Sequence, residues 1–437
     1  MKFFRLMMPL LALPAGRAYA QGSSGVASEV AAVYAQAEVL YKDLHQHPEL
    51  SGQERWTADR IAGELRQLGY EVTTGVGGTG VVAILKNGAG PTIMLRTELD
   101  ALPVTEATGL AFASTVRTKT ETGGETGVMH ACGHDVHMSS AVATARIMAG
   151  TRSRWKGTLM IIGQPAEETG AGAKAMLADG LFTRFPKPEF AIAVHDDARF
   201  PAGRVGVHAG PVLSYADAVT ITVYGRGGHG ARPEATVDPI VIAARIVLSL
   251  QTIVSRENSP FDPAVITVGA IHGGTKNNVI PDEVQMLLTV RSFTPEVREK
   301  LNRAIVRVAN GEAAAGNAPK PPKVERSGTG VALVNDPALT ARVNTALLKE
   351  LGANLVKDGP PEMVSEDFSE FMLAGVPTLM LRVGAVEQGK YDAAMQSGVP
   401  LPSLHSSAFF PDRQPTITST IASEVVALRA LLAPGAK

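Results

Sequence analysis

Residues 159–168 read Leu-Met-Ile-Ile-Gly-Gln-Pro-Ala-Glu-Glu. This apolar run, followed at once by a loop with two carboxylates, predicts a buried strand that ends in polar side chains. Short apolar runs bounded by turn residues recur at 81–85, 92–96 and 190–195. Between the runs, apolar residues with helical spacing occupy 139–148 and 171–179. This alternation predicts an α/β domain with a mainly parallel, buried sheet that is flanked by helices.

The pattern changes near residue 214. Residues 217–225 alternate between apolar and polar side chains, as a half-buried strand does. The residues that follow predict a helix at 237–256, strands at 264–272 and 284–293, and a helix at 295–314. This order indicates a smaller α+β insert, of ferredoxin-like type, at 214–328. The α/β pattern resumes with elements at 337–351, 377–383 and 416–432, so we expect the main domain to comprise 21–213 and 329–437.

Residues 1–20 have the features of an export signal. Lys2 and Arg5 precede a short apolar run at 6–13, and Ala18-Tyr19-Ala20 matches a small-residue cleavage site. The apolar run is shorter than the ~20 residues that span a bilayer, so we expect a cleaved signal peptide rather than an anchor. The mature protein is therefore expected to be exported, either periplasmic or secreted, and free of the membrane.

The composition excludes several classes of protein. The 437 residues include 41 basic and 42 acidic side chains, and a formal net charge of -1 argues against a polybasic nucleic-acid-binding protein. A single cysteine excludes an intramolecular disulfide framework and any CxxC zinc site. Residues 75–80 match G-x-G-x-x-G, but a strand is predicted to follow them, so they do not form a dinucleotide-binding fingerprint.

Candidate metal ligands gather at predicted strand ends and on loops. Residues 129–137 contain the one cysteine, Cys132, and His134, and thiolate and imidazole are favoured ligands of zinc and similar ions. The other candidates are Glu167, Glu168, His195 and His405. Each residue alone has an ordinary structural explanation, such as a core cysteine, a helix-capping carboxylate or a hydrogen-bonded histidine. Together they favour a metal site, and Asp100 could orient a ligating imidazole.

The order of these motifs resembles the M20 metallopeptidase family, in particular its N-acyl-amino-acid amidohydrolases such as hippurate and indole-acetyl-amino-acid hydrolases. The resemblance spans about residues 40–425. It rests on HQHPELS (45–51), RTELDALP (96–103), MHACGHDVH (129–137), QPAEE (164–168), GRGGHGARP (225–233), NNVIP (277–281), SEDF (365–368) and LHSS (404–407). A run of motifs in this order is far more specific than any one of them.

The resemblance implies a set of metal ligands and a mechanism. The implied ligands are Cys132, His134, Glu168, His195 and His405. They would hold two divalent metal ions, most readily zinc or manganese, although cobalt and nickel also accept this set. Glu167 would be the general base and Asp100 an acid behind the ligands. This chain has Glu98 where the family usually carries Asp, and Glu98 is therefore not counted as a ligand. It also has Ser406-Ser407 where Asn-Pro is common.

The resemblance also implies residues that bind the substrate and an active site to which two subunits contribute. His229 would stabilise the oxyanion from the insert of a neighbouring subunit, which requires a homodimer or a higher homo-oligomer. Asn278 and Arg291 would hold the free carboxylate of the substrate. The structural alternatives are that Asn278 only shapes a turn before Pro281 and that Arg291 is an exposed strand cation.

The function that this implies is hydrolysis of the amide bond of a small N-acyl-L-amino acid. A dipeptidase or carboxypeptidase of the same family is the nearest alternative, because both cleave an amide beside a free carboxylate. An exported binding protein without catalysis is the alternative from another class, and it would leave Glu167 without a role. No residue of the sequence specifies the acyl group.

Overall fold

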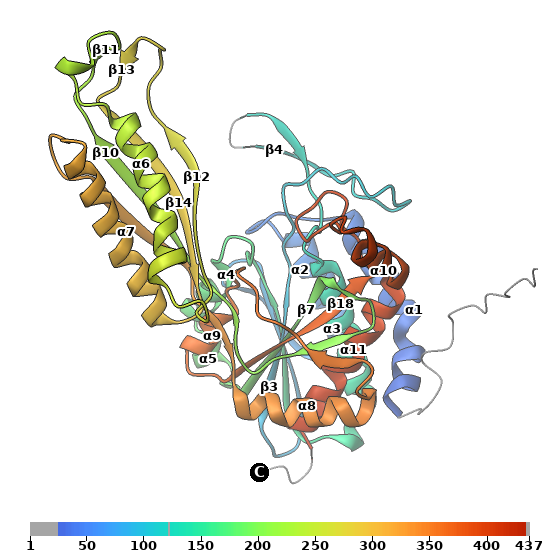
Figure 1. Cartoon of the computed structure of the whole chain (residues 1–437). Helices are drawn as coiled ribbons and strands as arrows, with labels where there is room; N and C mark the ends of the chain where they lie inside the picture. Colours follow the sequence, from blue (N-terminus) through green and yellow to red (C-terminus); the bar gives the residue numbers. More distant parts are fainter. Residues whose placement is uncertain (1–24, 121–122, 434–437) are drawn as a thin grey trace, which may run out of the picture.

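The computed structural model describes residues 25–120 and 123–433, so the predicted signal peptide at 1–20 lies outside the described residues. Figure 1 shows an α/β body from which a long, narrower arm projects. The arm is built from residues 215–330, and the insert was predicted at 214–328.

The body contains one sheet of eight strands in the order β1-β2-β6-β3-β7-β18-β8-β17. The strands are β1 (Glu71–Val76), β2 (Gly80–Asn87), β6 (Gly157–Gln164), β3 (Thr92–Glu98), β7 (Phe190–Pro201), β18 (Thr378–Val386), β8 (Val205–Val207) and β17 (Val356–Asp358). The four central strands β6, β3, β7 and β18 run parallel, whereas β1, β2 and β8 join by antiparallel pairing. The α/β fold with a mainly parallel central sheet is therefore confirmed.

Helices cover both faces of this sheet. One face carries α1 (Gly25–Gln46), α2 (Arg55–Gln67), α3 (His134–Gly150), α8 (Pro337–Leu351) and α11 (Arg413–Leu431). The opposite face carries α4 (Gly172–Ala178), α5 (Leu181–Arg184) and α9 (Ser369–Leu373). In β6, Leu159 and Ile161 enter the first core, and Met160 and Ile162 enter the second. A strand that is apolar on both faces reads as a continuous hydrophobic run, which explains the pattern at 159–163.

The arm has a sheet and a core of its own. Its strands are β10 (Tyr215–Tyr224), β12 (Ala264–His272), β14 (Glu283–Ser292) and β15 (Lys323–Gly330), all antiparallel in the order β12-β14-β10-β15. The helices α6 (Pro239–Thr252), continued by a π-helical turn at Ile253–Glu257, and α7 (Pro295–Ala315) pack on one face of this sheet. Asp238 and Thr294 cap these helices, each followed by proline in the first turn.

Shorter elements complete the described chain. They are β4 (Arg117–Lys119), β5 (Glu125–Gly127), β9 (Gly210–Leu213), β11 (Gly228–His229), β13 (Val279–Ile280), β16 (Leu333–Asn335), α10 (Gln388–Ser397) and 3-10 turns at Arg152–Arg154 and Pro233–Ala235. The glycine-rich run at 75–80 forms the turn between the antiparallel strands β1 and β2, in agreement with the rejection of a dinucleotide fingerprint.

Candidate metal centre

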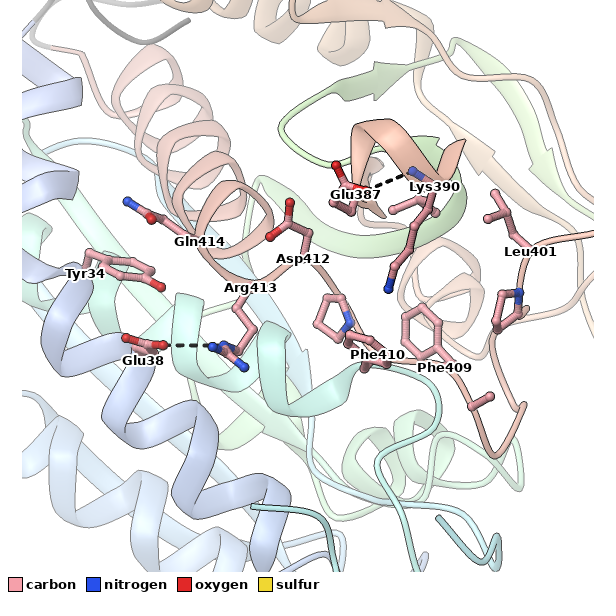
Figure 2. A pocket seen from close by; sticks show the side chains of 14 residues that line it. Tyr34, Glu38, Glu387, Lys390, Leu401, Phe409, Phe410, Asp412, Arg413 and Gln414 are labelled. Carbon is pink, nitrogen blue, oxygen red and sulfur yellow. Dashed lines mark hydrogen bonds and ion pairs between the residues drawn. The ribbon is translucent and has the colours of Figure 1, made fainter. Parts of the chain in front are cut away.

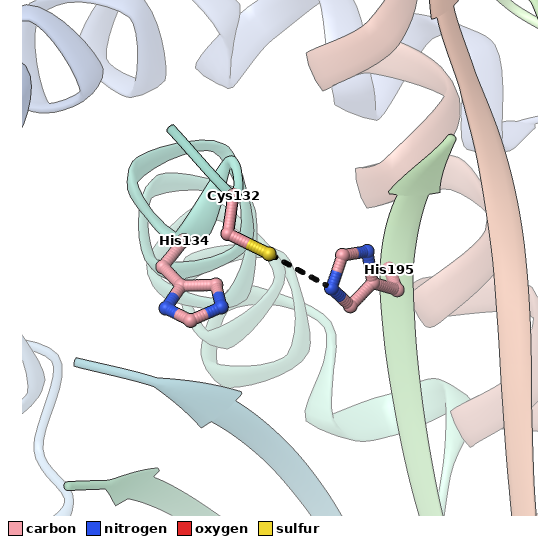
Figure 3. Close-up of side chains that lie close together, drawn as sticks. All are labelled: Cys132, His134 and His195. Atoms are coloured by element: carbon pink, nitrogen blue, oxygen red, sulfur yellow. Dashed lines mark hydrogen bonds between the residues drawn. The ribbon is translucent and has the colours of Figure 1, made fainter. Parts of the chain in front are cut away.

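The five side chains that were expected to bind metal converge in space, although 273 positions separate Cys132 from His405. The Cys132 Sγ atom lies 3.6 Å from His195 Nε2 and 3.2 Å from His405 Nε2. Figure 3 shows Cys132, His134 and His195 facing a common point. Several groups of possible ligands have atoms within 4.8 Å of one another, and two of them, Cys132–His134–His195 and Cys132–Glu168–His405, share the sulfur.

Backbone conformation brings the cysteine and the histidines together. Gly133 has φ +82°, and a Cβ atom at this position would overlap the carboxylate of Asp196. Only glycine therefore allows the turn that places Cys132 just before the first residue of α3, His134. His405 also lies in the left-handed region, with φ +67°, and its backbone N–H donates to the carbonyl of Ala131 at 2.8 Å. This bond docks the distant loop beside the cysteine.

Hydrogen bonds orient two of the imidazoles. The Nδ1 atom of His134 lies 2.7 Å from the backbone oxygen of Asp100, and the Nδ1 atom of His195 lies 2.8 Å from the backbone oxygen of Asp196. Because a carbonyl oxygen only accepts, each Nδ1 carries the proton and each Nε2 presents its lone pair to the cluster. This is the usual way in which outer groups fix the tautomer of a ligating histidine.

Asp100 lies beside His134 as predicted, but its carboxylate contacts other partners. The closer carboxylate oxygen, Oδ1, is 3.6 Å from His134 Nδ1. Oδ2 accepts the hydroxyl of Ser51 at 2.6 Å and the backbone N–H of Glu168 at 3.0 Å. The backbone carbonyl of Asp100 therefore orients the imidazole, while its side chain holds the loop that carries Glu168.

The donor set fits divalent metal ions. His134 Nε2 and Glu168 Oε1 are buried and have no hydrogen-bond partner among the described residues, which is costly unless a bound group satisfies them. Burial, together with the nearby charge of Glu168, raises the pKa of the Cys132 thiol well above its usual range. A thiolate at this position therefore needs an adjacent cation, and a coordinated metal ion is the usual one. Thiolate, imidazole and carboxylate together suit zinc and similar ions.

Glu167 lies beside the ligands without joining the groups that share the sulfur. Its Oε2 atom is 3.7 Å from His134 Nε2, and the side chain is buried. Burial, followed by the charges of Glu366 and Glu168, raises the pKa of this carboxyl well above its usual range. A carboxyl group that holds a proton so readily suits acid–base chemistry at neutral pH.

A cavity of about 520 Å³ opens over this cluster, between the body and the arm. Glu167, Glu168 and His405 line it from the body, and Arg291 lines it from β14 of the arm. The Arg291 Nε atom donates to Thr289 Oγ1 at 3.0 Å, and no carboxylate of the described residues lies within ion-pair distance of the guanidinium. Burial lowers the pKa of Arg291. The structure thus brings Arg291 to the site, half-buried and not exposed.

His229 and Asn278 lie elsewhere. They meet at the far tip of the arm, where β11 pairs with β13 and the backbone N–H of Gly230 donates to the Asn278 carbonyl at 2.8 Å. Both side chains are exposed, and Figure 1 places this tip at the end of the arm remote from the body. The structure therefore does not bring these two residues to the metal ligands of the same chain.

Sequence reasoning missed a buried charge network beneath the site. Arg96 is fully buried, and its guanidinium contacts Gln164 Oε1 at 3.0 Å, Glu366 Oε1 at 2.5 Å and Asp367 Oδ1 at 3.1 Å. Glu98 bonds to Arg96 as well, and its other oxygen lies 2.9 Å from His137 Nδ1. The glutamate at position 98, where the family usually carries aspartate, thus contacts both Arg96 and His137. The signal was present, because two of the quoted motifs, RTELDALP and SEDF, supply these charges.

A second buried cluster of charged side chains lies between the end of α1 and the start of α3. His45, at the end of α1, bonds through Nδ1 to Asp135 Oδ2 at 2.7 Å and through Nε2 to Glu106 Oε1 at 3.2 Å. Burial alone would lower the pKa of His45, but the hydrogen bonds and charges of these two carboxylates raise it to about 9. His45 therefore ties the first turn of α3, which begins with His134, to α1 and to the loop after β3.

A separate hollow of about 470 Å³ lies among α1, α10 and the loop that follows His405, as Figure 2 shows. Most of the charged side chains that line it already have partners. Glu38 pairs with Arg413 at 3.4 Å, and Glu387 accepts the backbone N–H of Lys390 at 2.9 Å. The Lys390 ammonium lies over the ring of Phe410. We assign no ligand to this hollow.

Comparison with known proteins agrees with this arrangement. Residues 94–398 match the model of peptidase family M20/M25/M40. The hippurate hydrolase of Campylobacter jejuni is 35% identical over 347 residues, which cover 78% of this chain and 86% of that protein. Thermostable carboxypeptidase 2 of Saccharolobus solfataricus is 33% identical over 394 residues, 89% of this chain and 94% of that protein.

A solved structure extends the similarity to the whole fold. The YxeP protein of Bacillus subtilis, described as a dinuclear metal-binding peptidase of the M20 family, superimposes with a TM-score of 0.75 at 29% identity. The match covers 92% of this chain and 99% of that chain. With its fold, its cluster of ligands and these relatives, the chain belongs to the M20 family of metal-dependent hydrolases.

Proposed function

We propose that this protein hydrolyses the amide bond of N-acyl-L-amino acids at a pair of divalent metal ions. The observation that carries the proposal is the sharing of Cys132 between two groups of ligands, with Glu167 beside them. Five ligands are too many for one tetrahedral ion with an open position, and they suit two ions with a bridging ligand. His134 and His195 would hold one ion, Glu168 and His405 the other, and Cys132 both.

Bound here, two such ions would lower the pKa of a water molecule and polarise the amide carbonyl. Glu167 then acts as the proton carrier. It accepts the proton of the attacking water and returns it to the nitrogen of the departing amine. The burial and the neighbouring carboxylates that raise the pKa of Glu167 make it a strong enough base for the first transfer and leave it protonated for the second.

Arg291 supports a substrate with a free carboxylate. Its guanidinium faces the same cavity as Glu167 and Glu168 and lacks a carboxylate partner among the described residues. An arginine fork binds a carboxylate through two parallel N–H bonds, with fixed orientation as well as charge. The amino-acid half of the substrate would therefore point toward β14, which leaves the acyl half near the loops of the body.

We propose in addition that the site is completed by a second copy of the chain. His229 and Asn278 lie side by side at the tip of the arm and are exposed, so they can act only on a site outside their own body. The outer face of α6 carries the exposed apolar side chains Val241 and Leu248, and β12 is an edge strand with exposed Ile271. Unpaired strand edges and apolar helix faces are surfaces that partners cover.

The segment Pro239–Glu257 is also apolar and long enough to cross a membrane by length and composition alone. Its inner residues Ile242, Ile246 and Leu250 pack in the core of the arm, and Arg245 interrupts the run. One face of this helix thus lies in a protein core. Its exposed apolar face is therefore better explained as part of a homodimer interface than as a surface in a membrane.

Sedimentation of the purified chain would show a dimer, and Leu248→Glu would release monomers with a lower kcat if His229 acts across subunits.

A carboxypeptidase or dipeptidase remains the second candidate. One of the relatives reported above is named a carboxypeptidase, and Arg291 would bind the free carboxylate of a peptide equally well. Export is a further proposal and rests on residues 1–20 alone. Amino-terminal sequencing of the protein from a periplasmic or culture fraction would find Gln21 as its first residue.

The test is hydrolysis of a panel of N-acyl amino acids and dipeptides by metal-loaded protein. Acyl amino acids are expected to react fastest, activity should disappear with a chelator, and Glu167→Gln should bind metal but lose at least about a hundredfold in kcat. Faster turnover of dipeptides would favour the second candidate. Hydrolysis by Glu167→Gln at the parental rate would refute the assignment of the base.

A further inference from the structure

The loop that carries Glu167 and Glu168 begins with a strained residue. Ala166 has φ +50°, in the left-handed region that a residue with a Cβ atom adopts only at a cost. This cost lowers the population of the left-handed conformation about tenfold relative to the right-handed one, so an unrestrained alanine would leave it. The strain is located one residue before Glu167, where a backbone rotation would redirect the carboxyl group.

A buried carboxylate holds this strained residue in place. The Oε1 atom of Glu54 accepts the backbone N–H of Ala166 at 2.8 Å and that of Gly52 at 2.8 Å. Its Oε2 atom accepts the hydroxyl of Thr79 at 2.6 Å. Glu54 is completely buried, and no Lys, Arg or His among the described residues lies within ion-pair distance of it. One carboxylate thus joins the start of α2, the turn between β1 and β2, and the Glu167 loop.

The same loop is fixed on the far side of Glu167. Asp100 accepts the N–H of Glu168 at 3.0 Å, and Asp367 accepts the N–H of Ala173 at 3.0 Å. The carbonyl oxygen of Ala166 accepts the N–H groups of Ala171 and Gly172, each at 3.2 Å, and the hydroxyl of Thr169 at 3.1 Å. Glu54 is the partner of the N–H of Ala166, and loss of this bond would leave that donor unsatisfied and remove the restraint on the amino side of the strained residue.

We propose that Glu54 is a positioning residue for the catalytic base: by hydrogen bonding to the N–H of Ala166 it keeps the strained backbone in place and so fixes the direction of Glu167. The inference rests on the proposed function only in naming Glu167 as the base. Glu54 does not touch the metal ligands, and its effect should therefore fall on kcat and not on metal content.

The test compares Glu54→Ala with two variants that restore what it loses. In Glu54→Ala, kcat should fall about 10- to 100-fold, because small misplacements of a reacting group cost this much, with KM within about threefold and metal content unchanged. Glu54→Gln should stay within about threefold of the parent, because the amide oxygen still accepts both N–H groups and its NH2 can donate to Thr79. Glu54→Ala with Ala166→Gly should recover about tenfold in kcat, because glycine adopts a positive φ freely.

Asp336→Ala is the matched control. Asp336 also accepts a backbone N–H, that of Leu339 at 2.8 Å, and it caps α8 at the opposite end of the body. Its loss should lower the melting temperature and leave kcat unchanged. If Glu54→Ala does not fold, Glu54→Asp, which is one methylene too short to reach Ala166, takes its place with the same expected rescue.

Hydrogen exchange separates this proposal from the proposed function. The backbone amides of 166–172 should exchange faster in Glu54→Ala than in the parent and in Glu54→Gln, whatever substrate the enzyme takes. If the parent hydrolyses none of the panel, faster exchange still supports the role of Glu54. Unchanged exchange, a parental kcat in Glu54→Ala, a loss explained by metal content, or no rescue by glycine would each overturn it.

Discussion

Replacement of Arg96 by methionine should destabilise the protein in a manner that depends on pH. The guanidinium is fully buried and contacts three carboxylates, those of Glu98, Glu366 and Asp367. Methionine fills most of the space of the arginine stem but leaves these carboxylates without their cation. Removal of one partner from a buried ion pair typically costs about 3–5 kcal/mol, and here three partners lose the same cation.

The sign of the pH dependence follows from burial. Even beside Arg96, burial raises the pKa of Asp367 to about 7. Without the guanidinium, the pKa of Asp367 in the folded state rises further above its unfolded value of about 4. The folded variant then binds more protons than the unfolded chain, so its stability decreases as the pH rises. We expect a loss of about 3–5 kcal/mol at pH 8 and a clearly smaller loss at pH 5.

Urea unfolding of metal-loaded Arg96→Met and parent at both pH values measures this difference. Arg199→Met is the matched control, because Arg199 also contacts two carboxylates, Asp197 at 2.9 Å and Glu362 at 2.7 Å, but its side chain is 43% exposed. The control should lose at most about 1 kcal/mol, with little dependence on pH. A loss in Arg96→Met that is equal at pH 5 and pH 8, or below about 1 kcal/mol at both, would refute the reasoning.

Three further predictions address the site and its supports. Arg291→Met should raise KM for acyl amino acids about 10- to 100-fold with kcat largely kept, as expected when a hydrogen bond to a charged group is lost, whereas substrates with an amidated carboxyl should show no such change in steady-state assays. Gly133→Ala should lower metal content, measured by elemental analysis, because its Cβ atom would overlap Asp196 at a positive φ. His45 has a pKa raised to about 9, so its contribution to stability should be complete below about pH 6.5 and lost as the pH rises through 9. The stability difference between the parent and His45→Gln, measured by urea unfolding, should shrink over that interval, and a difference that grows would contradict the assignment.

Much of the fold could be predicted because its strands are buried on both faces. Runs such as 159–163 read as continuous apolar segments only when both sides of a sheet are covered. The strand β15 was missed for the opposite reason. Lys323–Gly330 pairs with β10 at the edge of the arm sheet and is mostly exposed, so its sequence carries polar side chains without alternation. The antiparallel pairing of β1, β2 and β8 was also not predicted, because the direction in which two strands pair does not change their amino-acid composition.

The candidate site divides in the same way. Cys132 and the histidines could be predicted because their chemistry is distinctive. Their exact places could not be predicted, since Cys132 and His405 lie in turns as expected, whereas His134 begins α3 and His195 lies within β7, which continues to Pro201. Glu54 and Arg96 could not, because a buried charged residue looks like a surface residue until its partners are known. Their partners are up to 271 positions away, and only the folded chain brings them together.

The proposed function depends on the sharing of Cys132 by two metal ions. A crystal structure of the manganese- or zinc-loaded protein, with an anomalous difference map, would locate these ions. We expect two peaks within bonding distance of Cys132 Sγ, one beside His134 and His195 and the other beside Glu168 and His405. A map with no peak at these side chains after metal loading, or with a single peak that Cys132 does not contact, would contradict it.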